Sequence, residues 1–254
     1  MSPPSLVRIS GVQKRFGTGP LVLDGIDLTV PRGEFVSFIG PSGCGKSTLL
    51  RLIAGLTPAS AGELVIDGMT PESARALMFF VFQDANLMPW RRVAENVELP
   101  LLLRGDPVEQ RRERVAKMLE IVGLAAEAAK YPWQLSGGMK MRVSIARALS
   151  VAPKILLLDE PFGALDEMTR DKLNEDLLAI RARDPFTAFF VTHSVTEAVF
   201  LSTRIVVLSA NPGRVATSID VPFAYPRPAE LRETPEFLQL LGATTHALRA
   251  VRNH

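Results

Sequence analysis

Apolar and polar positions alternate along residues 6–30, and this period of two predicts β-strands at the start of the chain. A glycine-containing turn at 17–20 divides the stretch into two strands. Short, mostly apolar runs recur further along the chain. They predict additional strands at 34–39, 63–68, 77–82, 155–158, 188–191 and 204–208.

Helix-period patterning replaces the strands from about 92 to 150, where we predict a helical insertion. Shorter helices are predicted between strands, at 49–54, 168–183 and 195–201. The run at 155–158 is apolar throughout, as expected of a strand buried on both faces of a parallel sheet. Alternating strands and helices therefore predict an α/β fold with a parallel sheet, followed from 221 by a short, proline-punctuated C-terminal extension.

Composition excludes several classes of protein. The 254 residues are 47% hydrophobic, enough for one large domain or a domain with a subdomain. A net charge of +2 is too small to indicate nucleic-acid binding. The single cysteine rules out an internal disulfide framework. Because no apolar run approaches the roughly 18 residues of a membrane span, and no secretory signal is recognisable, we expect a cytoplasmic chain.

A glycine-rich segment between a predicted strand and a predicted helix has the pattern G-x-x-x-x-G-K-[ST]. Its residues are Gly40, Pro41, Ser42, Gly43, Cys44, Gly45, Lys46, Ser47 and Thr48. Backbone N–H groups of such a loop surround a phosphate at the positive end of the following helix. Lys46 is placed to reach the β- and γ-phosphates, and the Ser47 hydroxyl to ligate Mg²⁺. The segment predicts binding of a nucleoside triphosphate.

An acidic pair, Asp159 and Glu160, directly follows the apolar run at 155–158. Ligands of open α/β sheets bind at the carboxyl ends of the strands, so we expect the pair beside the phosphate loop. Asp159 would orient Mg²⁺ there. Glu160 would polarise an attacking water, a role worth about two to four powers of ten in rate. The alternative is a pair of solvated carboxylates at a strand end.

A second potential anion site is formed by Ser136, Gly137 and Gly138, which precede a helix-period stretch. They would lie at a helix N-terminus, where backbone N–H groups are free to bind an anion. The alternative is an ordinary helix cap. Because a helical insertion separates this segment from the phosphate loop, we interpret the two as holding one triphosphate from opposite sides, with the second supplied by another protomer.

These motifs, in this order, resemble the ATP-binding cassette (ABC) family over nearly the full chain. In addition to the phosphate loop, the matching motifs are Gln83 as the Q-loop, 135–138 as the signature, 155–160 as the second acidic motif, 163–166 as the D-loop and His193 as the switch histidine. The resemblance implies an ABC-type P-loop NTPase. Its RecA-like parallel-sheet core would carry an N-terminal antiparallel β subdomain and a helical signature subdomain.

The resemblance also implies how the chain is divided. It would form a single nucleotide-binding domain over 1–254. The catalytic core with its β subdomain would occupy 1–83 and 152–220, the helical subdomain 84–151, and the C-terminal extension 221–254.

Roles for single residues follow from the same resemblance. Phe16 matches the aromatic that stacks on adenine, although core packing is the alternative. Gln83 would contact Mg²⁺ or the lytic water, or act only as a capping amide. His193 would contact the γ-phosphate and hold the water against Glu160. Asp166 would cross a dimer interface, and the same residue is suited to cap the following helix.

Two positions carry further expectations. Met141 stands where many importer subunits have a glutamine, so a polar contact from this position is in doubt. Cys44 lies inside the phosphate loop at a helix N-terminus, where the pKa of a thiol tends to fall. We therefore expect alkylation of Cys44 to block ATP turnover, and ATP to protect against it.

Several short segments outside the shared ABC motifs, or extending them, resemble those of the nitrate/sulfonate/taurine-type importers. These segments are 81–84, 87–91, 131–132, 192–199 and 209–214. The resemblance implies an ATPase that uses ATP and Mg²⁺ and works as a head-to-tail homodimer or paired cassette. It would be peripheral, at the cytoplasmic face of the inner membrane, beside transmembrane permease subunits and, indirectly, a solute-binding protein.

An apolar groove for a helix of the permease would include Leu87, Trp90, Val93 and Val97, unless these residues pack internally. The solute does not touch this chain, and only resemblance indicates a small anion of the nitrate, sulfonate or taurine kind. The competing functions are an ABC ATPase of another transport system, a soluble non-transport ABC ATPase, a phosphate-loop kinase and a nucleotide-gated module without turnover. The signature and His193 argue against the kinase, and Glu160 argues against the module.

Overall fold

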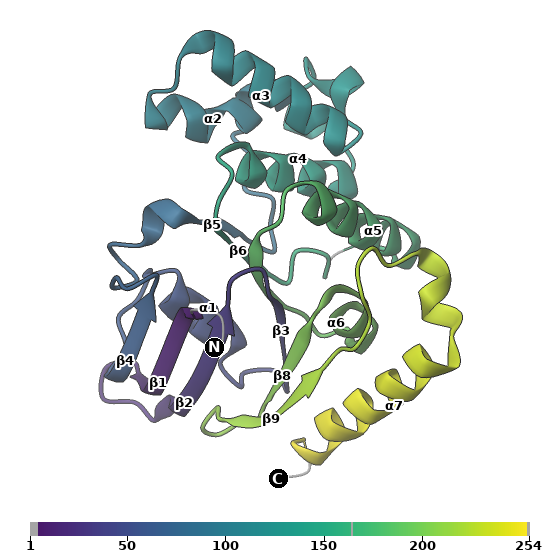
Figure 1. The fold of residues 1–254 in the computed structure, drawn as a ribbon. Helices are drawn as coiled ribbons and strands as arrows, with labels where there is room; N and C mark the ends of the chain where they lie inside the picture. Colours follow the sequence, from purple (N-terminus) through teal and green to yellow (C-terminus); the bar gives the residue numbers. More distant parts are fainter. Residues whose placement is uncertain (1–4, 164, 253–254) are drawn as a thin grey trace.

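The structure is a computed structural model that describes residues 5–163 and 165–252. Figure 1 shows a six-stranded sheet through the middle of the molecule, a three-stranded sheet beside it and a group of helices beyond one edge. Within the described residues, no helix combines the length and the apolar character that crossing a membrane requires.

The smaller sheet is antiparallel and is formed by the first strands of the chain. Strands β1 (Ser5–Arg15), β2 (Leu21–Pro31) and β4 (Ala61–Ile66) lie in the order β2-β1-β4. Two strands predicted within 6–30, with a turn between them, are confirmed. The strand expected at 63–68 begins and ends two residues earlier, because Asp67 and Gly68 turn the chain with positive φ values.

The larger sheet places strands from distant parts of the sequence side by side. It contains β3 (Phe35–Ile39), β5 (Met78–Val81), β6 (Ile155–Asp159), β7 (Thr187–Val191), β8 (Arg204–Leu208) and β9 (Val215–Asp220). The order is β5-β6-β7-β3-β8-β9, and all neighbours are parallel except β8 and β9. Strand β9 was not predicted, because this edge strand is half-buried or exposed along its whole length.

Seven α-helices surround the sheets in the part of the chain that the structure describes. They are α1 (Lys46–Ile53), α2 (Val93–Arg104), α3 (Val108–Ile121), α4 (Gly137–Ser150), α5 (Glu167–Arg183), α6 (Val195–Leu201) and α7 (Pro235–Ala250). Single 3₁₀ turns occur at η1 (Arg75–Leu77), η2 (Ala125–Glu127) and η3 (Pro132–Gln134), and a longer one at η4 (Ala229–Glu233). Residues 92–150 contain helices and no strand, as predicted for this stretch.

The central sheet separates two apolar cores. Ile155 and Leu157 of β6 pack with α1 and the small sheet, whereas Leu156 and Leu158 pack with the helices of the opposite face. Every residue of β3, β6 and β7 is buried. Side chains on alternate faces of a strand therefore anchor it from both sides, as the apolar run at 155–158 predicted.

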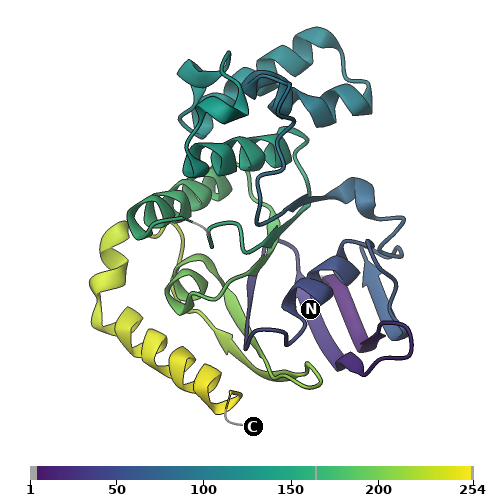
Figure 2. The ribbon, with the colours of Figure 1, turned by 180° about the vertical axis from the view of Figure 1, so that it is seen from behind.

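The C-terminal segment is bound to the rest of the molecule. Helix α7 runs beside α6, which both ribbon views show (Figures 1 and 2). The Arg227 guanidinium is buried and donates hydrogen bonds to the carbonyl oxygens of Val199, Phe200 and Phe223. Its carbon lies 4.1 Å from the ring centre of Tyr225. This segment is therefore an ordered part of the described structure.

Candidate functional site

The sheet order brings three loops to one edge. Strands β6, β7 and β3 are neighbours, and the residues that follow them carry Glu160, His193 and Gly40 respectively. The strands are parallel, so their carboxyl ends lie at the same edge. This is the part of an open α/β sheet where ligands bind.

Two positions of the loop from 40 to 48, Gly40 and Gly45, favour glycine. Gly45 precedes α1 with a φ of 98°, in the left-handed region that favours glycine. A side-chain carbon on Gly40 would lie 2.6 Å from the carbonyl oxygen of Leu208 and 2.8 Å from the Cys44 sulfur. The two glycines therefore allow the tight curve that turns the loop's N–H groups toward one side.

Lys46 holds its charge inside this curve. Its Nζ donates hydrogen bonds to the carbonyl oxygens of Gly40 and Pro41, each at 3.0 Å, and the side chain is buried. A cavity of about 250 Å³ opens beside it. The lining residues are Val22, Ser42, Gly43, Gly45, Lys46, Ser47, Thr48, Glu160 and His193. A cation in a nest of N–H groups is suited to bind phosphate.

A hydroxyl and a carboxylate meet at the edge of this cavity. Ser47 Oγ donates a hydrogen bond to Asp159 Oδ1 at 2.7 Å, and Asp159 is buried. Within residues 5–163 and 165–252, no cluster of three His, Cys, Asp or Glu side chains is suited to a metal. The pair fits Mg²⁺, which is commonly held by one or two carboxylates together with substrate phosphates and water.

Glu160 and His193 are in direct contact. His193 Nε2 lies 2.7 Å from Glu160 Oε1. Glu160 is mostly buried, and its backbone has a φ of 49°, with its N–H donating to the Val191 carbonyl at 3.0 Å. A non-glycine residue with positive φ is uncommon and clusters at functional sites. This contact holds the carboxylate toward the phosphate-loop cavity.

A second cavity, of about 300 Å³, lies on the other side of the Glu160–His193 contact. Its lining residues are Gln83, Glu160, Gly163, Arg170, Thr192, His193, Ser194 and Glu197. The structure therefore brings Gln83 together with Glu160 and His193, although the chain separates Gln83 from Glu160 by a long helical insertion.

Sequence reasoning missed a polar network behind His193. Thr192 Oγ1 donates to Glu197 Oε2 and accepts from the Ser194 N–H at 3.0 Å. Glu197 Oε1 lies 3.5 Å from Arg170 Nε. Burial raises the pKa of Glu197, although Thr192 and Arg170 oppose the shift. The available sequence signal was the S-x-x-E spacing from Ser194 to Glu197, which is typical of a helix start.

The network continues from Glu197 to the segment that precedes α5. Arg170 Nη2 donates a hydrogen bond to the Leu165 carbonyl oxygen at 2.8 Å. Leu165 belongs to the 163–166 motif, of which Ala164 lies outside the described residues. Asp166 caps α5, since its Oδ1 accepts from the Thr169 N–H at 3.0 Å. This bond lowers the pKa of Asp166 and confirms its predicted capping role.

Ser136 begins α4, as predicted. Its Oγ accepts a hydrogen bond from the Met139 N–H at 3.3 Å. A side-chain carbon on Gly138 would lie 2.6 Å from Thr169 Cγ2, so α4 and α5 approach closely where both begin. Among the described residues, the two cavities around Glu160 include neither Ser136, Gly137 nor Gly138. Within one chain, the two predicted anion sites do not form a common pocket.

Solvent exposure tests the roles predicted for four apolar residues. Phe16 is 53% exposed, with Lys14 Nζ 4.7 Å from its ring centre, so core packing is the wrong alternative for Phe16. Val93 and Val97 are fully buried in the core formed with the helices. Their predicted place in an exposed groove is wrong, because they face inward from α2. Trp90, by contrast, is 70% exposed.

Two further core positions bear on the sequence predictions. Met141 is buried among apolar side chains, which agrees with the loss of a polar contact there. Cys44 is fully buried, and this burial raises the pKa of its thiol more than nearby Lys46 lowers it. The expected fall in the pKa of Cys44 is therefore wrong, since the thiol points into the core rather than toward the phosphate site.

Comparison with known proteins gives consistent results. A family model described as ABC transporter matches residues 23–163. The taurine import ATP-binding protein of Sinorhizobium fredii is 45% identical over 242 residues, covering 93% of this chain and 91% of the relative. An aliphatic sulfonates import ATP-binding protein of Mesorhizobium japonicum is 49% identical over 219 residues, covering 85% and 80%.

A solved structure shows the same fold in a dimer. It is the post-hydrolysis state of an ATP-binding cassette bound to ADP and phosphate. The TM-score is 0.76 at 36% identity, over 86% of this chain and 100% of the solved one.

The burial of Cys44 predicts slow alkylation. At pH 8 we expect iodoacetamide to modify the folded protein at least about tenfold more slowly than the urea-unfolded chain, because reaction requires an exposed thiolate. Since Cys44 is the only cysteine, the mass gain of the intact chain reports its reaction directly. Equal rates in the two states would contradict the burial of this thiol.

Proposed function

The chain belongs to the ABC transporter family and is an ATPase of that family, and we propose that it powers the import of a small organic anion. The main support for the proposed site of hydrolysis is the contact between Glu160 and His193. Both residues line the cavity at the phosphate loop and the cavity next to it. The taurine and sulfonate import names of its relatives support the class of solute.

We propose that the triphosphate lies in the curve of residues 40–48, with Lys46 against the β- and γ-phosphates. The buried ammonium makes two hydrogen bonds to loop carbonyls at 3.0 Å, so its charge is already held where phosphate would enter. The positive end of α1 faces the same region. Phe16 is exposed and available to stack on adenine.

Ser47, Asp159 and Gln83 are proposed to hold Mg²⁺ together with the nucleotide. The Ser47–Asp159 hydrogen bond places two oxygen ligands side by side, and Gln83 lines the adjoining cavity. Mg²⁺ would neutralise charge on the phosphate oxygens during hydrolysis.

Glu160 is proposed as the general base, and His193 as its partner. His193 Nε2 contacts the Glu160 carboxylate. When a γ-phosphate enters, we expect the His193 N–H to donate to a phosphate oxygen instead. The Glu160 carboxylate would then accept a proton from water as the water oxygen bonds to the γ-phosphorus. The bond from this phosphorus to the β–γ bridging oxygen breaks, and ADP leaves with that oxygen. Once phosphate has left, His193 would contact Glu160 again.

The network behind His193 is proposed to position it. Glu197 joins the loop that carries His193 to Arg170, and Arg170 holds the Leu165 carbonyl next to Asp166. Motion at the γ-phosphate would therefore be passed to the segment before α5. Asp166 in this segment is proposed to lie at the contact with a second cassette.

A second copy would complete the site. Ser136, Gly137 and Gly138 begin a 14-residue helix but line neither cavity around Glu160 among the described residues. We propose a head-to-tail dimer, in which these residues of one copy face the phosphate loop of the other. The dimeric, ADP-bound cassette of the same fold supports this arrangement.

Membrane permease subunits are the proposed partners of the helical part of the chain. Trp90 is 70% exposed and Leu87 is half-buried, so both remain available for an apolar contact after Val93 and Val97 are assigned to the core. The chain would then lie peripherally at the cytoplasmic face of the membrane. A solute-binding protein would deliver the cargo from the other side. In this proposal, 84–151 act as the helical subdomain and 221–254 as the extension.

Replacing Glu160 by glutamine tests the proposed site. We expect E160Q to lower ATP turnover by about two to four powers of ten, because the amide cannot accept the water's proton. ATP should still bind and should hold the variant as a dimer in size-exclusion chromatography. E113Q, an exposed position on α3, is the matched control and should retain full turnover. An E160Q variant that hydrolyses ATP normally as a monomer would contradict the proposal.

The solute class is tested with the assembled transporter. We expect taurine or a short alkanesulfonate, delivered by the solute-binding protein, to stimulate ATP turnover of the complete complex in vesicles. An uncharged alcohol of the same size is the control. Stimulation only by solutes without an anionic group would reject the proposed class of cargo while leaving the hydrolysis mechanism unaffected.

A further inference from the structure

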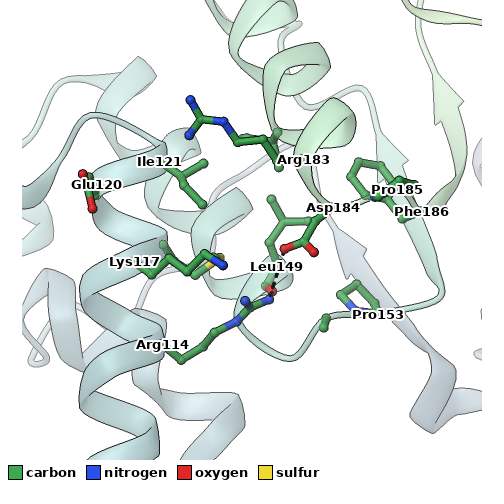
Figure 3. A pocket seen from close by; sticks show the side chains of 13 residues that line it. Arg114, Lys117, Glu120, Ile121, Leu149, Pro153, Arg183, Asp184, Pro185 and Phe186 are labelled. Atoms are coloured by element: carbon green, nitrogen blue, oxygen red, sulfur yellow. Dashed lines mark hydrogen bonds and ion pairs between the residues drawn. The ribbon is translucent and has the colours of Figure 1, made fainter. Parts of the chain in front are cut away.

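A separate pocket of about 260 Å³ lies at the C-terminal ends of α4 and α5. Figure 3 shows it from close by. It is bounded by α3, by the end of α4 and by the connection from α5 to β7. None of its lining residues belongs to the two cavities around Glu160. The pocket therefore needs an explanation other than nucleotide binding.

The wall of the pocket is largely apolar. Met118 and Ile121 come from α3, Leu149 from α4, Ile180 from α5, and Pro153 and Phe186 from the connections. In Figure 3, Ile121 and Leu149 face the space between α3 and the α5–β7 connection. Such a wall favours a compact apolar group, because its burial releases water from both surfaces.

One cation of the pocket is already partnered. Arg114 donates hydrogen bonds to the carbonyl oxygens of Leu149 and Ser150, each at 2.9 Å, and lies 3.7 Å from Asp184. It therefore stabilises the end of α4, whose carbonyl groups lack partners within the helix. The charges of Arg114 and Asp184 cancel, so this pair adds no net charge to the pocket.

Two other cations remain at the rim. Lys117 and Arg183 are exposed, and within the part of the chain that the structure describes neither forms an ion pair. Figure 3 shows Lys117 directed toward the middle of the pocket. Glu120 also lines the pocket, with its carboxylate on the side of α3 away from the Lys117 ammonium. The opening therefore combines an apolar wall with unpaired positive charge.

We propose that this pocket binds an organic anion with a compact apolar body, such as an aromatic or branched carboxylate or sulfonate. A cavity of about 150 Å³ holds benzene and drug-sized ligands need about 300 Å³ or more, so a volume of 260 Å³ suits one or two rings. The apolar body would pack against Ile121 and Leu149. The anionic group would lie beside the Lys117 ammonium, and Arg183 would add positive charge at the rim.

Occupancy of the pocket would act on the ATPase site from a distance. Helices α4 and α5 end at this pocket. Their other ends are capped by Ser136 and Asp166, the residues proposed to lie at the dimer contact. A ligand wedged between α3 and the ends of both helices would restrict their relative movement. This regulatory consequence rests on the proposed function, whereas binding itself does not.

Methyl NMR of the full chain tests the site, with 1-naphthalenesulfonate as the probe and ¹³C-methyl isoleucine as the label. We expect saturable shifts at Ile121 and Ile180, which line the pocket, and none at Ile26 and Ile66, which lie in the other core. K117A/R183A should weaken binding at least about tenfold, because the unpaired positive charge at the pocket is lost. R112A, an exposed charge on the same helix, should bind as the parent does.

Three outcomes would overturn the site. They are shifts centred on Ile26 and Ile66, equal affinity of K117A/R183A, and equal affinity for uncharged 1-naphthalenemethanol. Failure to saturate by about 10 mM would do the same, since it leaves only a weak surface association. ATP turnover in the same samples tests the consequence: saturation should change the parent's rate and leave that of K117A/R183A unchanged. An unchanged parent rate would reject regulation but retain binding.

Discussion

The carboxyl ends of three neighbouring parallel strands impose the geometry on which the rest of the molecule depends. Because β6, β7 and β3 lie side by side, the loops that carry Glu160, His193 and Gly40 must meet at one edge. Burial on both faces holds these strands in place through two separate apolar cores. The contacts at the edge, 2.7 Å between Ser47 and Asp159 and 2.7 Å between Glu160 and His193, follow from this arrangement.

The polar groups at this edge are held by contacts within the chain. Lys46 is bonded to two loop carbonyls, Asp159 to Ser47, and Glu160 to His193. In the proposed mechanism, such preorganisation lowers the reorganisation needed when charge develops on the phosphate. The proposal also requires the contact between Glu160 and His193 to open, so that His193 can donate to a phosphate oxygen.

Much of this site was predictable because its signals are local. The phosphate loop and the acidic pair each lie within a few residues of the strand that positions them, so pattern and position together indicated their chemistry. Tertiary contacts decided the rest. Val93 and Val97 are apolar whether they face a groove or a core, and only packing against the helices distinguishes these cases. The raised pKa of Cys44 depends on burial from all sides, and the contact between Arg170 and Glu197 joins separate helices.

In the proposed dimer, one chain holds only half of each hydrolytic site, because its own Ser136 segment lies outside the cavities at Glu160. Mixing two inactive variants tests this claim directly. K46A removes the phosphate-loop cation. S136D keeps a helix-capping side chain but places a negative charge toward the triphosphate. Each variant alone should lack ATP turnover, and the mixture should regain it, since a mixed dimer has one intact pair of halves. A mixture as inactive as its components, or full activity of S136D alone, would contradict the account.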